Sequence, residues 1–179
     1  MLENLPFEIP DSWTWIRFPY ISSSELGKTL NKEKDFGDMV PYLCSINVYW
    51  MGICLDNIKE TYFNKREQMK YKLEIGDLLV CEGGEAGRCA VWNMSQPMYY
   101  QNALHRIRFQ YNANSYFYKY VIETYYNLGL LNRFYKGVTI KHLVQSELNA
   151  IYLPFPPINE QLRIVNAINF ICKKLKDEG

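Results

Sequence analysis

The stretch that decides the fold reads LPFPPINEQLRIV and runs from Leu153 to Val165. Its three prolines, Pro154, Pro156 and Pro157, hold the chain extended. A proline also suits the first turn of a helix, where a missing amide proton costs nothing. The sequence therefore predicts an extended segment that leads into a helix beginning near Pro157.

Apolar residues recur along this predicted helix at the spacing of a coiled-coil seam. From Val165 onward the steps are three, four and three residues, which is an a/d pattern. An isolated helix of about three heptads is marginal in water. The pattern therefore predicts that the seam packs against a partner. Its residues are Ile158, Val165, Ile168, Cys172 and Leu175.

Four blocks of the chain resemble, in order, those of a target recognition domain in specificity (S) subunits of type I restriction-modification enzymes. The stretch from 153 to 165 is similar to the signature PLPPLxEQxRIV, which ends such a domain and opens the conserved spacer helix. LPFEIPDSWTWIRF is similar to the family's entry motif, EIGDLLVCEGGEAGRCAVW to its GDxLxxxxGxxGRxAxx hairpin, and YKGVTIKHLVQSELNAIYLPFPP to its GxxIKHLxxxxLxxLxIPLPP run. The ordered set is specific and spans Leu5 to Val165.

This resemblance implies an α+β fold: a twisted, mixed or antiparallel sheet with peripheral helices, followed by the start of a long spacer helix. The target recognition domain would cover residues 1–156 and the spacer or dimerisation helix residues 157–179. In the family, an S subunit holds two such domains at a distance set by two antiparallel spacer helices. Each domain reads one half of a split DNA target, and partner subunits carry methylation and ATP-dependent cleavage.

The partners implied by the resemblance are double-stranded DNA, methyltransferase (modification) subunits and, through them, restriction subunits. A single recognition domain implies either a half-subunit that forms a homodimer through the spacer helix or a piece of a longer S subunit. No cofactor is implied.

The distribution of charge is more informative than the net charge of +1. Residues 1–60 carry a net charge of −4, whereas residues 88–146 carry +6, because Glu123 is their one carboxylate. A basic segment of this length indicates a polyanion-binding surface. The alternative is a solvated surface whose acidic partners come from the N-terminal half. The basic residues are Arg88, Arg106, Arg108, Lys119, Arg133, Lys136 and Lys141.

The candidate DNA-contacting residues come from two sources. The resemblance implies that variable regions read bases, and it selects Lys28, Lys32, Tyr49 and Trp50. Side-chain chemistry selects others, because Gln and Asn can pair bidentately with adenine and Arg with guanine. These are Arg88, Gln101, Asn102, His105, Arg106, Lys136 and Lys141.

Each group has a structural alternative. Tyr49 and Trp50 are equally suited to capping a hydrophobic core. In QNALHRIRF the apolar residues alternate with polar ones, as in any half-buried strand, whose polar side chains simply face water. The glycine-rich turn at 83–87 is interpreted as a hairpin and not as a phosphate loop, because the Walker A lysine is missing and Glu82 and Glu85 would repel phosphate.

Composition limits the remaining functions. With 179 residues and 48% hydrophobic residues the chain has enough material for one ordinary core. No apolar run is long enough for a membrane span and no signal peptide is recognisable, so a cytoplasmic protein is expected. The five cysteines form no C-x-x-C pair, so neither a disulfide framework nor a metal site is predicted.

No catalytic motif accompanies His105 or His142, so the chain is not expected to be an enzyme by itself. Two other functions remain open at this point. The chain could be a protein-interaction module only, or it could be the specificity part of a fused restriction-methylation enzyme whose catalytic motifs lie beyond this sequence. Salt-dependent DNA binding would separate the first of these from DNA recognition.

Overall fold

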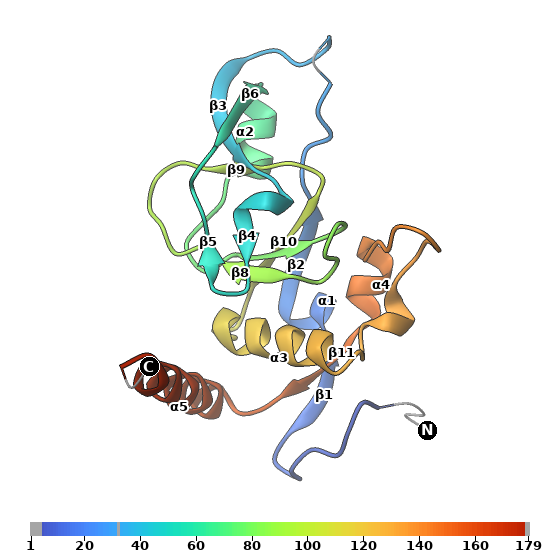
Figure 1. The fold of residues 1–179 in the computed structure, drawn as a ribbon, viewed down its shortest axis with the longest axis vertical. Helices are drawn as coiled ribbons and strands as arrows, with labels where there is room; N and C mark the ends of the chain where they lie inside the picture. Colours follow the sequence, from blue (N-terminus) through green and yellow to red (C-terminus); the bar gives the residue numbers. More distant parts are fainter. Residues whose placement is uncertain (1–4, 32, 178–179) are drawn as a thin grey trace.

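A computed structural model describes residues 5–31 and 33–177. It confirms an α+β fold with small, mostly antiparallel sheets and peripheral helices (Figure 1). The elements are β1 (Thr14–Arg17), α1 (Phe18–Ile21), β2 (Ser22–Leu26), β3 (Asp38–Leu43), β4 (Val48–Tyr49), β5 (Gly52–Ile53), β6 (Lys59–Phe63), α2 (Lys65–Tyr71), β7 (Leu78–Cys81), β8 (Cys89–Val91), β9 (Tyr99–Tyr100), β10 (Leu104–Phe109), α3 (Ser115–Asn127), α4 (Gln145–Ala150), β11 (Tyr152–Phe155) and α5 (Ile158–Asp177), with short 3-10 turns at Ser45–Asn47 and Asn132–Phe134.

The central sheet has four antiparallel strands in the order β2-β10-β7-β8. Its β7–β8 pair places Leu78 opposite Val91 and Val80 opposite Cys89, which confirms the predicted hairpin. Gly87 in the connecting turn has a φ of +94°. Only glycine adopts such a conformation readily, so this turn depends on that residue.

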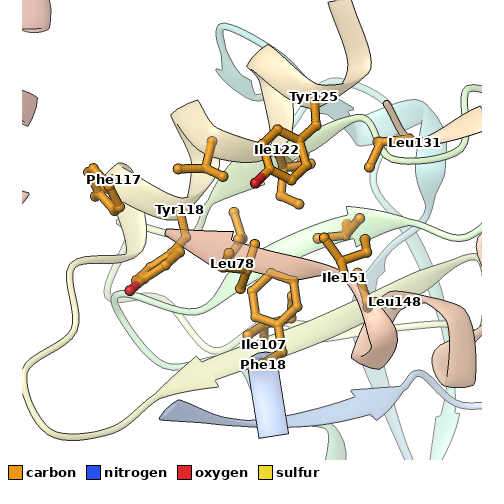
Figure 2. Packing of buried hydrophobic residues seen from close by; sticks show 14 of the residues in the cluster. Phe18, Leu78, Ile107, Phe117, Tyr118, Ile122, Tyr125, Leu131, Leu148 and Ile151 are labelled. Atoms are coloured by element: carbon orange, nitrogen blue, oxygen red, sulfur yellow. The ribbon is translucent and has the colours of Figure 1, made fainter. Parts of the chain in front are cut away.

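Both faces of β7 are buried. Leu78 and Val80 point into a cluster covered by α3, where Figure 2 shows Tyr118, Ile122 and Tyr125 over the sheet. The alternate residues, Leu79 and Cys81, belong to a second cluster on the other face, which also holds Trp92, Tyr100 and Leu104. Burial in this second cluster raises the pKa of the Cys81 thiol to about 11. An uninterrupted apolar strand is what such two-sided burial requires.

A distal lobe extends from the second face of the central sheet. We define it as β3, β6, β9, α2 and the connecting residues 27–37. Strand β3 pairs antiparallel with β6 and parallel with β9, and Val40, Tyr42, Phe63 and Tyr99 form a small core of their own. In Figure 1 the lobe occupies one end of the long axis of the molecule, and β1 and α5 lie toward the other end.

Strands β1 and β11 form a separate antiparallel ladder that joins two distant parts of the chain. Thr14 lies opposite Phe155, and Arg17 lies opposite Tyr152. The ladder places the entry segment beside the residues that lead into α5. Helix α5 begins directly after Pro157, as the proline pattern predicted.

The structure corrects three local predictions that the sequence favours. The Ser-, Gly-, Lys- and Asp-rich residues 22–39 predict a long loop, but Ser22–Leu26 forms an edge strand against β10. The apolar residues 40–48 predict one strand, but it stops at Leu43, where buried Asn47 accepts a hydrogen bond from the Cys44 amide (3.0 Å) and forms a turn. Ser115 is a typical N-cap residue, but Asn114 caps helix α3, since its side chain accepts from the amides of residues 116 and 117.

Gln161 attaches α5 to the domain. Its side chain is fully buried; Oε1 accepts from the Asn114 amide (2.9 Å) and Nε2 donates to the Pro156 carbonyl (3.0 Å). The amide at the start of α3 and the carbonyl before α5 are thus satisfied by one residue. One turn later, Val165 packs into the cluster below α3.

Replacing Gln161 with leucine should destabilise the domain, because two buried backbone groups lose their partners while the volume is kept. We expect the free energy of unfolding to fall by about 2 kcal/mol, measured by urea denaturation. Asn166→Ala, at an exposed position of the same helix, is the control and should change stability little. Equal stability of the Gln161→Leu variant and the wild type would show that the side chain does not fasten the helix.

Candidate nucleic-acid interface

Most cations of the basic segment 88–146 are neutralised inside the domain. Arg108 donates two hydrogen bonds to the buried Asp77 carboxylate (2.8 and 2.7 Å) and one to Glu74 (2.7 Å). Asp77 raises the pKa of Arg108, so this guanidinium stays charged and paired. Further ion pairs join Arg88 to Glu85, Lys119 to Glu123 and Lys136 to Glu147. The acidic partners of Arg88 and Arg108 come from the preceding part of the chain. This agrees with the alternative interpretation, in which acids of the N-terminal half neutralise the basic segment.

Two of the predicted base-reading residues are buried. His105 is fully buried and its Nε2 donates to the Leu143 carbonyl (2.8 Å), while burial lowers the pKa of its ring. Arg106 donates to the Lys70 carbonyl (3.3 Å) and lies beside the ring of Tyr100. Both side chains are enclosed by the domain, with exposed fractions of 0% and 9%, and their assignment as DNA contacts stays a prediction.

Lys28 is also a structural residue and not a surface contact. It is 3% exposed, and its ammonium group lies 2.7 Å from Glu67 Oε2, 3.1 Å from Asp35 Oδ1 and 2.8 Å from the Tyr62 carbonyl. The same ammonium lies over the ring of Phe63. One cation thus joins the 27–37 connection, β6 and α2, and it fixes the distal lobe. Lys32, the neighbouring candidate, lies outside the described residues.

The other candidates fall into three groups. Tyr49, Trp50 and Arg88 meet around Glu85: Trp50 Nε1 donates to that carboxylate (3.4 Å), and the Arg88 guanidinium lies 5.4 Å from the Tyr49 ring. Gln101 and Asn102 are half-buried in the turn before β10, beside the Lys28 backbone. Lys136 and Lys141 flank an exposed loop closed by the Lys136–His142 bridge.

The predicted seam divides between two environments. Val165 is buried in the domain core, Ile158 and Ile168 are half-buried, and Cys172 and Leu175 are exposed. Ile171, which the a/d pattern omitted, is 56% exposed. A second apolar stripe, with steps of four, three and four, runs beside the buried face of the helix. It consists of the half-buried Ile164 and Ile168 and the exposed Ile171 and Leu175.

The distal lobe exposes large side chains that its own fold does not use. Met39 and Tyr62 are direct cross-strand partners on β3 and β6, and both are exposed. Phe36 is 68% exposed just before β3, and Met69 is 76% exposed on α2. An apolar and aromatic group of this kind on one lobe marks an interaction surface.

Cations accompany these side chains. Lys34, Lys59 and Arg66 are exposed, and within the described ranges none of them forms an ion pair. The lobe's carboxylates Asp35, Asp38 and Glu67 are each paired with a lysine, whereas Glu33 and Glu60 are exposed. Its surface is therefore mixed, with positive, aromatic and thioether groups interspersed.

Helix α2 holds part of this surface in a defined position. Asn64 accepts from the amides of residues 66 and 67, and Glu67 accepts from the Asn64 amide (2.9 Å). This capping box is a sequence-level signal that was present in N-K-R-E. The apolar pattern alone does not indicate the helix, because residues 59–72 contain five cations and two acids and show no clear apolar period.

In the described parts of the chain no three His, Cys, Asp or Glu side chains are grouped so that they could hold a metal ion. Among the same residues there is no helix long and apolar enough to cross a membrane.

Comparisons with known proteins identify the domain. Residues 13–176 match the family model described as the type I restriction modification DNA specificity domain. No curated protein sequence matches the chain.

Solved structures share the fold. A chain from a study of the complex assembly and conformational transition of the type I R-M system superposes with a TM-score of 0.73 at 16% identity, over 96% of this chain and 41% of that one. The HsdS subunit from Thermoanaerobacter tengcongensis gives 0.68 at 16% identity, over 98% and 41%. The S subunit from M. genitalium gives 0.59 at 17%, over 96% and 42%. The chain thus spans about two fifths of each of these proteins.

The buried position of Lys28 generates a stability prediction. Lys28→Met should lower the free energy of unfolding by about 3 kcal/mol, because Asp35 and Glu67 lose the cation that compensates them. Urea denaturation measures this change. The control is Lys65→Met, which removes an exposed lysine from the same lobe and should have a small effect. A Lys28→Met variant as stable as the wild type would contradict the structural role.

Proposed function

The chain belongs to the family of type I restriction-modification DNA specificity domains, and we propose that it reads one half of a split double-stranded DNA target for such a complex. The observation that supports this most directly is the distal lobe, with its exposed cations, aromatic rings and methionines. Within the proposal the chain is a non-catalytic specificity component. Methylation and cleavage belong to modification and restriction subunits with which it assembles.

The elements of the distal lobe are compatible in shape with base reading. The major groove of B-DNA admits a two-stranded β-ribbon or an α-helix, and the lobe presents the β3–β6 ribbon and α2 together. Met39 and Tyr62 project from the ribbon, and Arg66 and Met69 from the helix. Arg66 is the candidate for a guanine contact, since its fork can pair bidentately with O6 and N7. Lys34 and Lys59 are candidates for phosphate contacts.

The apolar stripe of α5 supplies the second part of the proposal. A split target needs two recognition domains at a fixed distance, and an apolar stripe on a helix needs a second helix. Pairing of α5 with an equivalent helix, from a second copy or from another part of a longer S subunit, satisfies both requirements. The stripe Ile164, Ile168, Ile171 and Leu175 would form the contact, and the length of the pair would set the half-site spacing.

DNA binding should depend on salt through the distal lobe. If about four to six phosphates are contacted, log K should fall against log salt with a slope of roughly −4 to −5. Lys59→Ala should weaken binding to all sequences and reduce that slope by about 1, whereas Arg66→Ala should relax preference at one base position and cost about 1–3 kcal/mol. Fluorescence anisotropy with target and scrambled duplexes measures both effects.

The matched comparison is Lys141→Ala, which removes an exposed lysine of the basic segment outside the lobe. If Lys141→Ala changes the slope and Lys59→Ala does not, the interface lies on the basic segment and the distal lobe is not the reading surface. Absence of any salt-dependent duplex binding, with modification subunits present, would contradict DNA recognition altogether.

The spacer role can be tested at Ile171, whose side chain has no part in the domain core. Ile171→Asp places a charge in the stripe, where burial without a partner is costly enough to prevent helix pairing. Light scattering should show the mass of one chain, and methylation of the split target should be lost. Leu162→Asp is the control, because Leu162 is exposed on the opposite side of α5. If Ile171→Asp retains both assembly and methylation, the stripe does not hold the two recognition domains.

A further inference from the structure

A small cup lies beside the β1–β11 ladder, away from the surface assigned to DNA. Its volume is about 400 Å³, and its walls are Trp15, Ile16, Arg17, Tyr20 and Tyr152. These residues come from β1, α1 and β11, next to the segment that leads into α5. The cup and the distal lobe belong to opposite ends of the molecule, as Figure 1 shows for β1 and β3.

Arg17 is the charged group of the cup, and its partners are neutral. Its guanidinium lies 4.4 Å from the centre of the Tyr152 ring, and Nη2 donates to the Tyr152 hydroxyl (2.7 Å). Its Nε is buried without an acceptor. Across residues 5–31 and 33–177, no carboxylate lies within ion-pair distance of Arg17. A half-buried cation that lacks an anion is costly, and an incoming carboxylate would relieve this cost through charge-assisted hydrogen bonds.

The walls of the cup have the composition of a protein-binding site. Trp, Tyr and Arg are the residue types that dominate the binding energy of protein interfaces. Tyr20 lies at the rim of the cup and is 72% exposed, so its ring is accessible to a partner. Trp15 is half-buried and packs against Phe7, so it gives the cup a firm wall.

The surrounding charge argues against nucleic acid as the occupant. Arg17 is the one cation among residues 1–27, which also contain four carboxylates. Of these, Glu8 and Asp11 are exposed near β1. A polyphosphate backbone would meet repulsion from these acids and a single attractive group. A single carboxylate carries much less charge than a polyphosphate backbone, so its repulsion from these acids is smaller and one guanidinium can compensate it.

We propose that the cup docks an Asp or Glu side chain, with an adjacent apolar residue, that the modification subunit presents. The carboxylate pairs with the Arg17 guanidinium, and the apolar neighbour packs between Tyr20 and Trp15. The inference rests on the proposed function, which supplies the partner. The inference adds where the modification subunit binds this chain. The binding surface is beside α5, on the side away from the proposed DNA contact.

The test is calorimetric binding of the full chain to the modification subunit with which it is proposed to assemble. Arg17→Met keeps most of the side-chain stem and removes the charge, and Tyr20→Ala removes an exposed ring without touching the core. Each should weaken subunit binding by about tenfold or more, and the salt dependence of DNA binding by the chain alone should stay as in the wild type. Tyr111→Ala, at an equally exposed tyrosine elsewhere, is the control and should bind the subunit as the wild type does.

Two results would overturn the cup as the docking site: wild-type subunit affinity in both variants, or loss of DNA binding in place of subunit binding. Failure of the wild-type chain to bind the subunit at all would remove the proposed partner as well. The proposed function fails separately. The wild-type complex could form, be weakened by Arg17→Met and yet show no DNA sequence preference. That result would support the cup as the docking site and contradict DNA recognition.

Discussion

The two-sided burial of β7 is the constraint on which the rest of this domain depends. Because Leu78 and Val80 face α3 while Leu79 and Cys81 face the second cluster, each side of the central sheet must be covered by a different part of the chain. Helix α3 covers one side, together with α4 and β11. The segments that lead to the distal lobe cover the other side. The distal lobe and the start of α5 therefore lie on opposite sides of the central sheet.

Internal ion pairs decide which cations remain for a partner. Arg108 is held by Asp77 and Glu74, and Lys28 by Asp35 and Glu67, so these charges stabilise connections between elements. The distal lobe keeps Lys34, Lys59 and Arg66 without an ion pair among the described residues, because Asp35, Asp38 and Glu67 are paired with other lysines. The cations proposed to meet DNA are therefore those that internal pairing leaves over, and they lie outside the basic segment 88–146.

The arrangement separates two tasks that a specificity domain must combine. The distal lobe is proposed to contact bases, and the opposite end carries α5 and the Arg17 cup, which are proposed to contact protein. Gln161 and the β1–β11 ladder connect α5 to the domain through buried hydrogen bonds and strand pairing. The position of one proposed interface therefore constrains the position of the other, as the proposed fixed spacing of half-sites would require.

The sequence by itself determined the elements whose signals are local: the proline-led start of α5, the β7–β8 hairpin around its glycines and, through four ordered motifs, the fold class and family. The serine-rich strand β2 and helix α2 cannot be predicted in this way, because their residues lack a clear apolar period.

The tertiary structure decided which of the candidate residues are accessible to a partner. Lys28, His105 and Arg106 carry polar groups suited to DNA, but packing encloses them, and Val165 faces its own core while Ile171 is left free. Burial and ion pairing depend on residues far apart in the chain, so no local pattern could have assigned them.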